Sequence, residues 1–270
     1  MLDIVVGTCS EERHINSNSE ASLRYWAGVL RLCTQSNIIY PADEGRDVYA
    51  VGSVVIKTGH RLGEAPIDYT YADANEVEAI AIARRVLTDV RVPDIYFADK
   101  INGLPVLVQE RLPGVSLTVA WPYLSPSQKT SFKAQARGIL AQLRTVQAPT
   151  DHPRRDHVVP DPGILTNGRV SPTEARILFS ADTDGDACFM HNDLTASNLI
   201  VWDDRITGLV DWEMAGYFGW RVAAEVHRAV RSPRREGYAQ AGVSEEKLRD
   251  ILWWNDLYVR RGDAVGGILA

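Results

Sequence analysis

A hairpin pattern in residues 190–213 limits the possible folds of this chain more than any other feature. The segment reads MHNDLTASNLIVWDDRITGLVDWE. Two short apolar runs, 199–201 and 206–210, flank a polar turn, which is typical of a β-hairpin. Paired strands hold opposite Cα atoms roughly 5 Å apart, so the residues that bracket the hairpin, Asn198 and Asp211, lie close together. Their amide and carboxylate oxygens suit Mg²⁺, which predicts a magnesium site at the open end of the hairpin.

A further carboxylate, that of Asp193, stands on the loop that enters the hairpin. It can face the same cleft without binding the metal. Transfer of a phosphoryl group needs a cation to neutralise the phosphates and a carboxylate to orient and deprotonate the attacking hydroxyl. Taken singly, His191 is better interpreted as a buried core histidine, and Asp193 and Asn198 as residues that shape a turn. The joint pattern of HxDxxxxN, a hairpin and DxE favours phosphoryl transfer.

The N-terminal half supplies a lysine of the kind that a kinase-like site needs. The apolar strand Val54-Val-Ile-Lys57 ends in it, and Val55 shares its face by the two-residue period of a strand. A solvated lysine at a strand end is the alternative. In a kinase-like site, the carboxylate partner of Lys57 would be Glu76 or Glu78. These two side chains point about 200° apart on a helix, so only one of them can pair with Lys57. We prefer Glu76, which begins an apolar stripe, although it also fits a capping residue.

The order of the predicted elements indicates an α+β fold rather than alternating βαβ units. Short strands separated by glycine turns come first, and helices dominate after the break at Leu112-Pro-Gly114. We therefore expect a small β-rich N-terminal lobe with one key helix over residues 1–111, and a larger, mainly helical lobe over 112–270. The predicted elements, in chain order, are a helical extension at about 19–33; strands at 37–40, 47–51 and 53–58; a helix at 75–87 capped by Asp73; strands at 95–99 and 105–109; a helix from Ser125-Pro126; a long loop at 148–170; a helix capped by Ser171 and Glu174; and a mainly helical tail from Ala223.

Composition narrows the class of protein. The chain has 270 residues, 24% of them charged, and a net charge of −6, which disfavours a general binder of nucleic acid or anionic membranes. No apolar run approaches the roughly 20 residues of a membrane span, and the N-terminus lacks the features of a signal peptide. The three cysteines are widely spaced, so we expect neither a disulfide framework nor a zinc site, and a cytoplasmic location.

At these motifs the sequence resembles the aminoglycoside phosphotransferase and choline kinase family, and especially its kinase-like members in fungi. The resemblance runs from about Asn37 to Trp220, and it is strongest at residues 191–198 and 210–213. It implies a two-lobed protein-kinase-like fold and an ATP- and Mg-dependent enzyme, with GTP as a possible substitute for ATP. The acceptor would be a hydroxyl group of a small molecule.

The resemblance also implies a role for each matching residue. Asp193 would be the catalytic base, and Asn198 and Asp211 would bind Mg²⁺. Lys57 would hold the α- and β-phosphates, and Glu76 would position it. Val55 would lie against the adenine, and the main chain of Glu110 and Leu112 would hydrogen-bond the adenine edge.

Some features depart from kinase patterns. No GxGxxG covers the phosphates, and the first turn, residues 43–46, has a single glycine. Asn192 stands where the family more often has a small residue. No Ala-Pro-Glu follows Asp211, so a protein kinase is disfavoured. Two alternatives stay open: a catalytically silent nucleotide-binding or scaffold protein, and an enzyme that uses the same site for another transfer, such as that of a nucleotidyl group.

The charge of the C-terminal segment bears on the acceptor. The segment from Asp211 to Ala270 contains nine acidic and nine basic residues, so it has no acidic excess that would pair with a polycation. We therefore expect a neutral, weakly charged or aromatic acceptor, or one with a single cation held on an aromatic ring.

Overall fold

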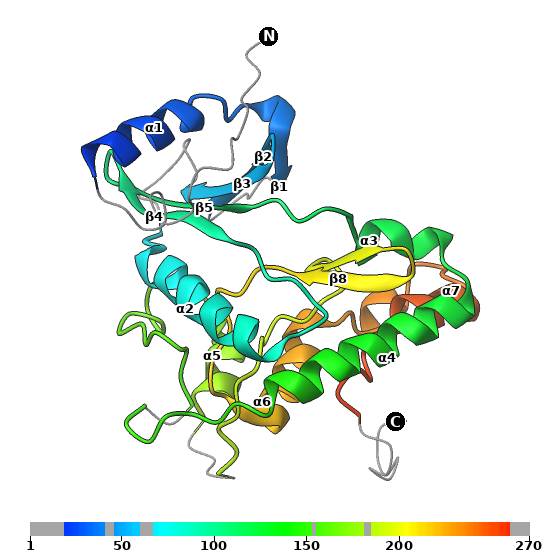
Figure 1. Cartoon of the computed structure of the whole chain (residues 1–270). Helices are drawn as coiled ribbons and strands as arrows, with labels where there is room; N and C mark the ends of the chain where they lie inside the picture. The colour runs from blue at the N-terminus through cyan, green and yellow to red at the C-terminus, as the bar shows by residue number, and fades with distance from the viewer. Residues whose placement is uncertain (1–18, 41–45, 60–66, 153–154, 181–184, 260–270) are drawn as a thin grey trace.

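The computed structural model describes residues 19–40, 46–59, 67–152, 155–180 and 185–259. The predicted first turn at 43–46 lies outside this part except for Arg46. Figure 1 shows two parts: a small sheet near the N-terminus and a larger, mainly helical part below it. No helix among the described residues is long and apolar enough to cross a membrane.

An antiparallel sheet of five strands forms the small part, in the order β1-β2-β3-β5-β4. The strands are β1 (Ile38–Tyr40), β2 (Arg46–Val51), β3 (Val54–Gly59), β4 (Ile95–Ile101) and β5 (Leu104–Glu110). A short 3₁₀ turn, η2 (Gln35–Asn37), precedes them. One face of the sheet packs on helix α1 (Glu20–Leu30), where Trp26 and Leu30 meet Ile56 and Phe97. In this strand order β3 lies in the middle of the sheet, and hydrogen bonds to β2 and β5 hold its backbone on both sides.

Helix α2 (Thr70–Val86) connects β3 to β4 and begins earlier than the predicted Asn75. The predicted cap at Asp73 is wrong: this residue lies inside the first turn, and its buried carboxylate accepts from the guanidinium of Arg46. A capping box satisfies backbone N–H groups locally. Here a buried cation from β2 competes for the same carboxylate and determines its position.

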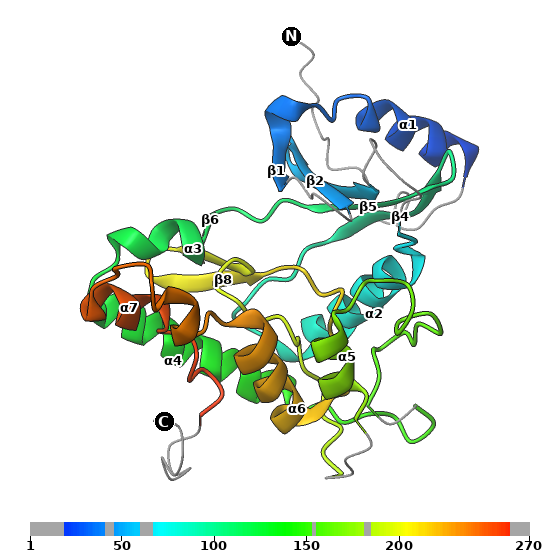
Figure 2. The same cartoon turned by 180° about the vertical axis from the view of Figure 1, so that it is seen from behind.

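The larger part holds a second sheet and most of the helices (Figures 1 and 2). Its strands are β6 (Val115–Ser116), β7 (Leu199–Trp202) and β8 (Arg205–Leu209), in that order. Its helices are α3 (Leu117–Ala120), α4 (Pro126–Leu143), α5 (Pro172–Leu178), α6 (Gly219–Val226) and α7 (Glu245–Ile251), with 3₁₀ turns η3 (Trp121–Tyr123) and η5 (Arg235–Tyr238) and a π-helical turn η4 (His227–Arg231). Between α4 and α5 the described residues form neither helix nor strand, as the proline-rich stretch predicts.

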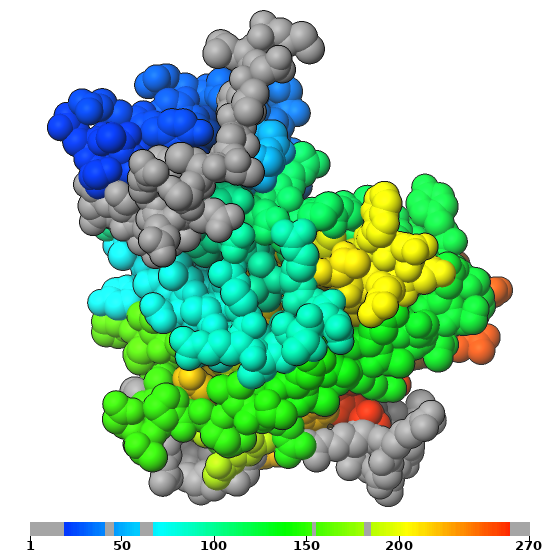
Figure 3. Space-filling view, viewed as in Figure 1, coloured from blue at the N-terminus to red at the C-terminus, as the bar shows by residue number. Residues whose placement is uncertain are grey.

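The β7–β8 hairpin is the one that residues 190–213 predict. Asp203 and Asp204 take φ of 48° and 58°, as a two-residue turn between twisted strands requires. Figure 3 shows this yellow hairpin at the surface, between the cyan and green segments. Strand β6 pairs with β7 and so joins the segment after β5 to the hairpin.

The two predicted boxes of the larger part differ in outcome. Ser125 and Gln128 form a complete capping box at the start of α4. Ser171 accepts from the N–H of Glu174, as a cap should, but the Glu174 carboxylate accepts from Arg231 instead of completing a box. The carboxylate is buried, and a cationic partner stabilises it more than a backbone N–H would.

The main hydrophobic core extends from α2 and β5 into the larger part. It joins Ile80 and Leu107 to Leu117, Phe132 and Trp212. A smaller core lies between α5 and α6, which lie side by side in Figure 2. Because the core is continuous, α2 and the residues that it carries are held against the loop that follows β8.

Candidate functional site

Lys57 occupies the centre of the site. Its buried Nζ lies 2.9 and 2.8 Å from the two carboxylate oxygens of Glu76 on α2, and 2.6 Å from Oδ1 of Asp211 after β8. Burial lowers the pKa of Lys57, but the carboxylates of Asp211 and Glu76 outweigh this effect and raise it. The ammonium group is therefore fixed and charged, and it joins the small sheet to the hairpin loop.

Glu76, and not Glu78, pairs with Lys57. Glu78 lines a groove of about 470 Å³ on another face of α2, beside Ala98 and Lys100, and Lys57 is not part of its lining. Glu76 is fully buried, and burial raises its pKa while Lys57 opposes the rise.

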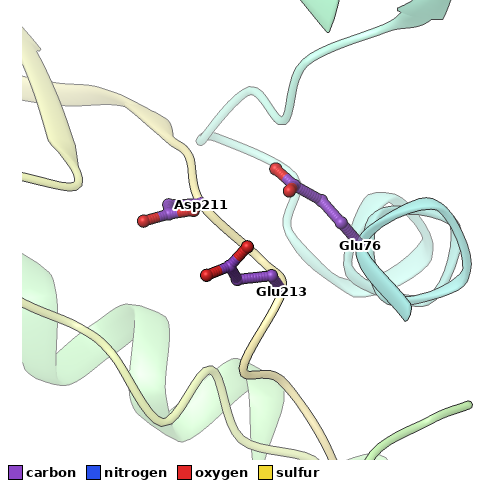
Figure 4. Close-up of side chains that lie close together, drawn as sticks. All are labelled: Glu76, Asp211 and Glu213. Carbon is purple, nitrogen blue, oxygen red and sulfur yellow. The ribbon is translucent and has the colours of Figure 1, made fainter. Parts of the chain in front are cut away.

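Asp211 sits at the turn after β8 with a φ of 67°, a left-handed conformation that aims its carboxylate back at Lys57. Figure 4 shows it beside Glu76 and Glu213, and carboxylate oxygens of the three lie within 4.8 Å of one another. Burial would raise the pKa of Asp211, but Lys57 lowers it to about 2. Asp211 is therefore ionised at neutral pH, as a ligand of a hard cation must be.

Asn198 and Asp211 are brought together by the hairpin. The N–H of Val210 donates to the carbonyl of Asn198 at 3.0 Å, which holds the two ends of the hairpin in register. The side-chain amide nitrogen of Asn198 donates to the carbonyl of Asp193 at 2.9 Å. That bond leaves the amide oxygen as the atom available for a cation. One amide oxygen and one ionised carboxylate fit Mg²⁺, which keeps its remaining positions for water and phosphate.

Asp193 lies on the loop before the hairpin, with its Oδ1 3.1 Å from Nε of Arg231 at the end of η4. Burial raises the pKa of Asp193 to about 7, and Arg231 limits the rise. Arg231 also donates to the buried Glu174 of α5. A carboxylate with a pKa near the working pH is suited to accept a proton.

His191 ties the loop of Asp193 to the loop of Asp211. Its Nε2 lies 3.1 Å from the carbonyl of Val210, and its Nδ1 accepts from the N–H of Asp193 at 3.2 Å. The ring is fully buried against Trp212, and burial lowers its pKa to about 4. His191 is thus a neutral structural residue, and its core position does not conflict with the functional pattern around it.

The remaining predicted residues lie on β3, at the end of β5 and just after β5. Val55 is half-buried on β3, on the strand face of Lys57. The backbone N–H of Glu110 donates to the carbonyl of Asp94 at 2.8 Å, so this N–H is already used within the protein. Leu112 is buried, and Gly208 leaves space for its Cδ1, since a Cβ there would lie only 2.6 Å away.

Arg46 and Asn75 are contributors to the site that the sequence analysis did not identify. Arg46 donates to Asp73 and, at 2.5 Å, to Glu213. The buried Asn75 donates to the carbonyls of Glu213 and Ala215, both at 2.9 Å, and accepts from the N–H of Val159. Together they fasten α2 to the loop after β8.

Arg231 is a third. The DxE motif pointed to Glu213, but no pattern in the sequence pairs it with Arg46, and none links Arg231 to Asp193. Such pairs join residues far apart in the chain, and only the fold brings them into contact.

Asn192, the unusual residue in the motif, has a role of its own in the structure. It takes a φ of 60°, and its amide nitrogen donates to the carbonyl of Met214 at 2.9 Å. The backbones of Met190 and Gly216 pair beside it, with bonds of 2.8 and 3.0 Å. These contacts place the Asp193 and Asp211 loops side by side.

Comparison with known proteins gives the family. The model of the phosphotransferase enzyme family (APH) matches residues 69–223, more than half of the chain. A comparison with curated proteins finds no match. Among solved structures the chain is similar to the gentamicin complex of APH(2")-IIa, with 12% identity over 89% of this chain and 82% of that chain, and a TM-score of 0.50. It is also similar to the streptomycin-ATP ternary complex of APH(2")-IIa, with 12% identity, coverage of 89% and 92%, and a TM-score of 0.47.

The likeness to the gentamicin complex concerns the fold alone, and it agrees with the arrangement described above. The predicted two-lobed, kinase-like α+β fold and the predicted resemblance are confirmed. The chain belongs to the phosphotransferase enzyme family.

Proposed function

We propose that this phosphotransferase moves the γ-phosphoryl group of ATP to a hydroxyl group of a small molecule, in a Mg²⁺-dependent reaction. One observation carries the proposal: Lys57, held by Glu76, contacts Asp211, which the hairpin sets beside Asn198 and the loop of Asp193. These are the groups that transfer of a phosphoryl group requires, in one place.

Each residue has a distinct task in this reaction. Lys57 binds phosphate oxygens of the nucleotide, and Glu76 keeps it aimed at them. Asn198 and Asp211 would hold Mg²⁺, which would neutralise the phosphates. Asp193 orients the acceptor hydroxyl and takes its proton as the hydroxyl oxygen bonds to the γ-phosphorus and the bond from that phosphorus to the leaving ADP breaks.

The adenine would lie against Val55, with its edge at the main chain of Glu110 and Leu112. Backbone contacts of this kind recognise the hydrogen-bond pattern of the base. A binding test should therefore compare ATP with GTP. The chain leaves the first sheet after β5. We therefore propose that residues 1–111 form one lobe and residues 112–270 the other.

We propose an acceptor that is not strongly polycationic. A polycation would need carboxylates around Asp193 to pair its ammonium groups. Glu174, one of the carboxylates that interact with Asp193, is already paired with Arg231. The balanced charge of residues 211–270 points the same way.

A screen of hydroxylated metabolites, amino alcohols and antibiotics with Mg·ATP tests the function. The expected result is a product heavier by one phosphate, absent without Mg²⁺ and nearly absent with Asp193→Asn. A mass gain of a nucleotidyl group would favour the alternative transfer. Nucleotide binding without turnover of any acceptor or of water would favour a silent protein. If kanamycin-like substrates match or exceed every neutral alcohol in kcat/KM, the proposed acceptor class is wrong.

A further inference from the structure

Arg231 joins the proposed base to a buried carboxylate on another helix. Its Nε lies 3.1 Å from Oδ1 of Asp193, and one terminal nitrogen, Nη2, donates to Glu174 of α5. The side chain of Glu174 is 4% exposed. The arginine stands at the end of η4, which packs on the small core between α5 and α6 through Ala229 and Val230. The guanidinium group is therefore held at two of its nitrogens before any substrate binds.

The second terminal nitrogen of this guanidinium is left for a ligand. In the part of the chain that the structure describes, Nη1 of Arg231 makes no hydrogen bond and no ion pair. The side chain is 19% exposed, whereas its Nε is buried. A guanidinium group carries five N–H donors and is charged at all working pH values. Arg231 therefore presents a fixed cationic donor beside the base.

Negative charge surrounds Asp193. Its carboxylate interacts electrostatically with those of Asp211, Glu174 and Glu213. Lys57 is held 2.6 Å from Asp211. The sequence also has no GxGxxG whose backbone would cover the phosphates. A γ-phosphoryl group that approaches the base would thus meet several carboxylates, and a cation at the base would offset their repulsion.

The reaction brings the γ-phosphoryl group within reach of Arg231. A base lies about 3 Å from the hydroxyl whose proton it takes, and the attacking oxygen starts about 3–3.5 Å from the phosphorus. The transferred group therefore lies within about 6 Å of the Asp193 carboxylate. Nη1 lies in the same range, because it belongs to the same planar group as the Nε that is 3.1 Å from Asp193.

We propose that Arg231 is a catalytic residue that binds the γ-phosphoryl group of the nucleotide through its Nη1. The inference rests on the proposed function and adds to it a cation for the transferred group, where Lys57 serves the other two phosphates. The acceptor oxygen bonds to the γ-phosphorus, the bond from that phosphorus to the leaving ADP breaks, and Asp193 takes the hydroxyl proton. Nη1 donates to a non-bridging oxygen during this step, so the donor is in place as charge develops.

The binding of two nucleotides tests the inference without measuring turnover. AMP-PNP, a non-hydrolysable analogue of ATP, has a γ-phosphoryl group, and ADP lacks one. In calorimetric titrations with Mg²⁺, Arg231→Gln should weaken binding of AMP-PNP by about tenfold, the loss of one charge-assisted hydrogen bond, and change that of ADP by less than about twofold. A residue that only stabilises the fold or orients Asp193 would not distinguish the two nucleotides.

Arg228→Gln is the matched control. Arg228 stands in the same turn η4 and is exposed, and within the described residues it has no ion pair with Asp193 or Glu174. Both nucleotides should bind to this variant as they bind to the unchanged chain.

Arg231→Lys keeps the test valid if the glutamine variant does not fold. It retains the charge beside Glu174, but a single ammonium group lacks the planar fork that contacts Glu174, Asp193 and a phosphoryl oxygen together. This variant should weaken binding of AMP-PNP by about threefold or more and leave that of ADP unchanged.

The outcomes separate the inference from the function on which it rests. A selective loss of AMP-PNP binding in the Arg231 variants supports the inference. An equal change for both nucleotides, or no change for either, would overturn it and leave the phosphotransferase proposal in place. An unchanged chain that binds neither nucleotide in the presence of Mg²⁺ would contradict both.

Discussion

Asp193 and Asp211 are both aspartates at the ends of the same motif, yet their surroundings shift their pKa values in opposite directions. Burial raises the pKa of Asp193 to about 7, whereas Lys57 overcomes burial and lowers that of Asp211 to about 2. The first can take up a proton near neutral pH, and the second stays charged. The difference arises from the cations that the fold provides: Lys57 lies 2.6 Å from Asp211, and Arg231 lies 3.1 Å from Asp193.

Substitution of the two aspartates should therefore have different consequences. Asp193→Asn should lower turnover by roughly 10²–10⁴-fold and largely spare nucleotide binding, because it removes only the base. Asp211→Asn should also weaken binding of Mg·AMP-PNP. Calorimetric titration of both variants, together with kcat, distinguishes the two effects. A stable Asp193→Asn protein that no longer binds nucleotide would contradict the roles assigned.

His191 links folding stability to pH. Its folded pKa of about 4 is below its ordinary value of 6.5, so the unfolded chain takes up the proton first. Its contribution to stability is therefore full above pH 6.5 and is lost as the pH falls toward 4. Asp193, with a raised pKa, has the opposite sign: its contribution is lost as the pH rises through about 7.

A comparison with His191→Gln isolates the histidine, since Asp193 is present in both proteins. Between pH 7.5 and 5.0 the free energy of unfolding of the unchanged chain should fall by about 2 kcal/mol relative to that of the variant, one and a half pKa units of linkage. Urea unfolding at the two pH values measures this difference. Parallel pH curves for the two proteins would rule out a buried neutral His191.

At the scale of elements, close backbone contacts decide how β6 and the hairpin meet. Gly114, just before β6, takes a φ of 119°, and an added Cβ would lie 2.7 Å from the carbonyl oxygen of Val201 and 2.8 Å from Cγ2 of Ile200. Only glycine fits both the conformation and the space. Gly103, in the turn between β4 and β5, has a φ of 82° but no atom within 4 Å of such a Cβ.

The two glycines form a matched pair for mutation. Gly103→Ala should cost about 1 kcal/mol, from backbone strain alone. Gly114→Ala adds contact with the backbone of β7, and we expect a cost of about 3 kcal/mol. Denaturant unfolding with an unchanged m-value gives both numbers. Equal costs for the two variants would mean that the packing of Gly114 on β7 contributes nothing.

At the scale of the whole molecule, the two lobes share a hydrophobic core. Ile80 of α2 and Leu107 of β5 belong to the same cluster as Phe132 and Leu140 of α4. Asn75 adds polar bonds across the same boundary. The small sheet has its own core around Trp26 and Phe97, but its other face rests on the shared one. We therefore expect the lobes to unfold together.

Trp26→Phe tests this cooperativity. The change removes volume from a buried site in the small lobe and should cost about 1–2 kcal/mol. If the molecule unfolds as one unit, the whole curve shifts by the same amount by far-UV circular dichroism and by tryptophan emission. A shift confined to part of the amplitude would show instead that the small lobe unfolds separately.

How much of the site the sequence predicts depends on how local each relation is. The hairpin brings Asn198 and Asp211 together within a short stretch, so apolar runs and a polar turn suffice to place them. The strand ending in Lys57 is equally local. The choice between Glu76 and Glu78 was narrowed by helix geometry, because their side chains point to different faces, but the packing of α2 on β3 decided it.

Ion pairs between residues far apart in the chain could not be predicted from the sequence. Arg46 and Glu213 are 167 positions apart, and neither stands in a pattern that names the other. The local pattern predicts that Asp73 and Glu174 are capping residues. Each pairs instead with an arginine from elsewhere in the chain, Asp73 with the buried Arg46 and Glu174 with Arg231. The kind of fold and the groups around the hairpin can be predicted from the residues alone, since hydrophobic period and turn residues act over a few positions. Which charges meet depends on the folded arrangement, because burial makes an unpaired carboxylate costly and the nearest cation in space pairs with it.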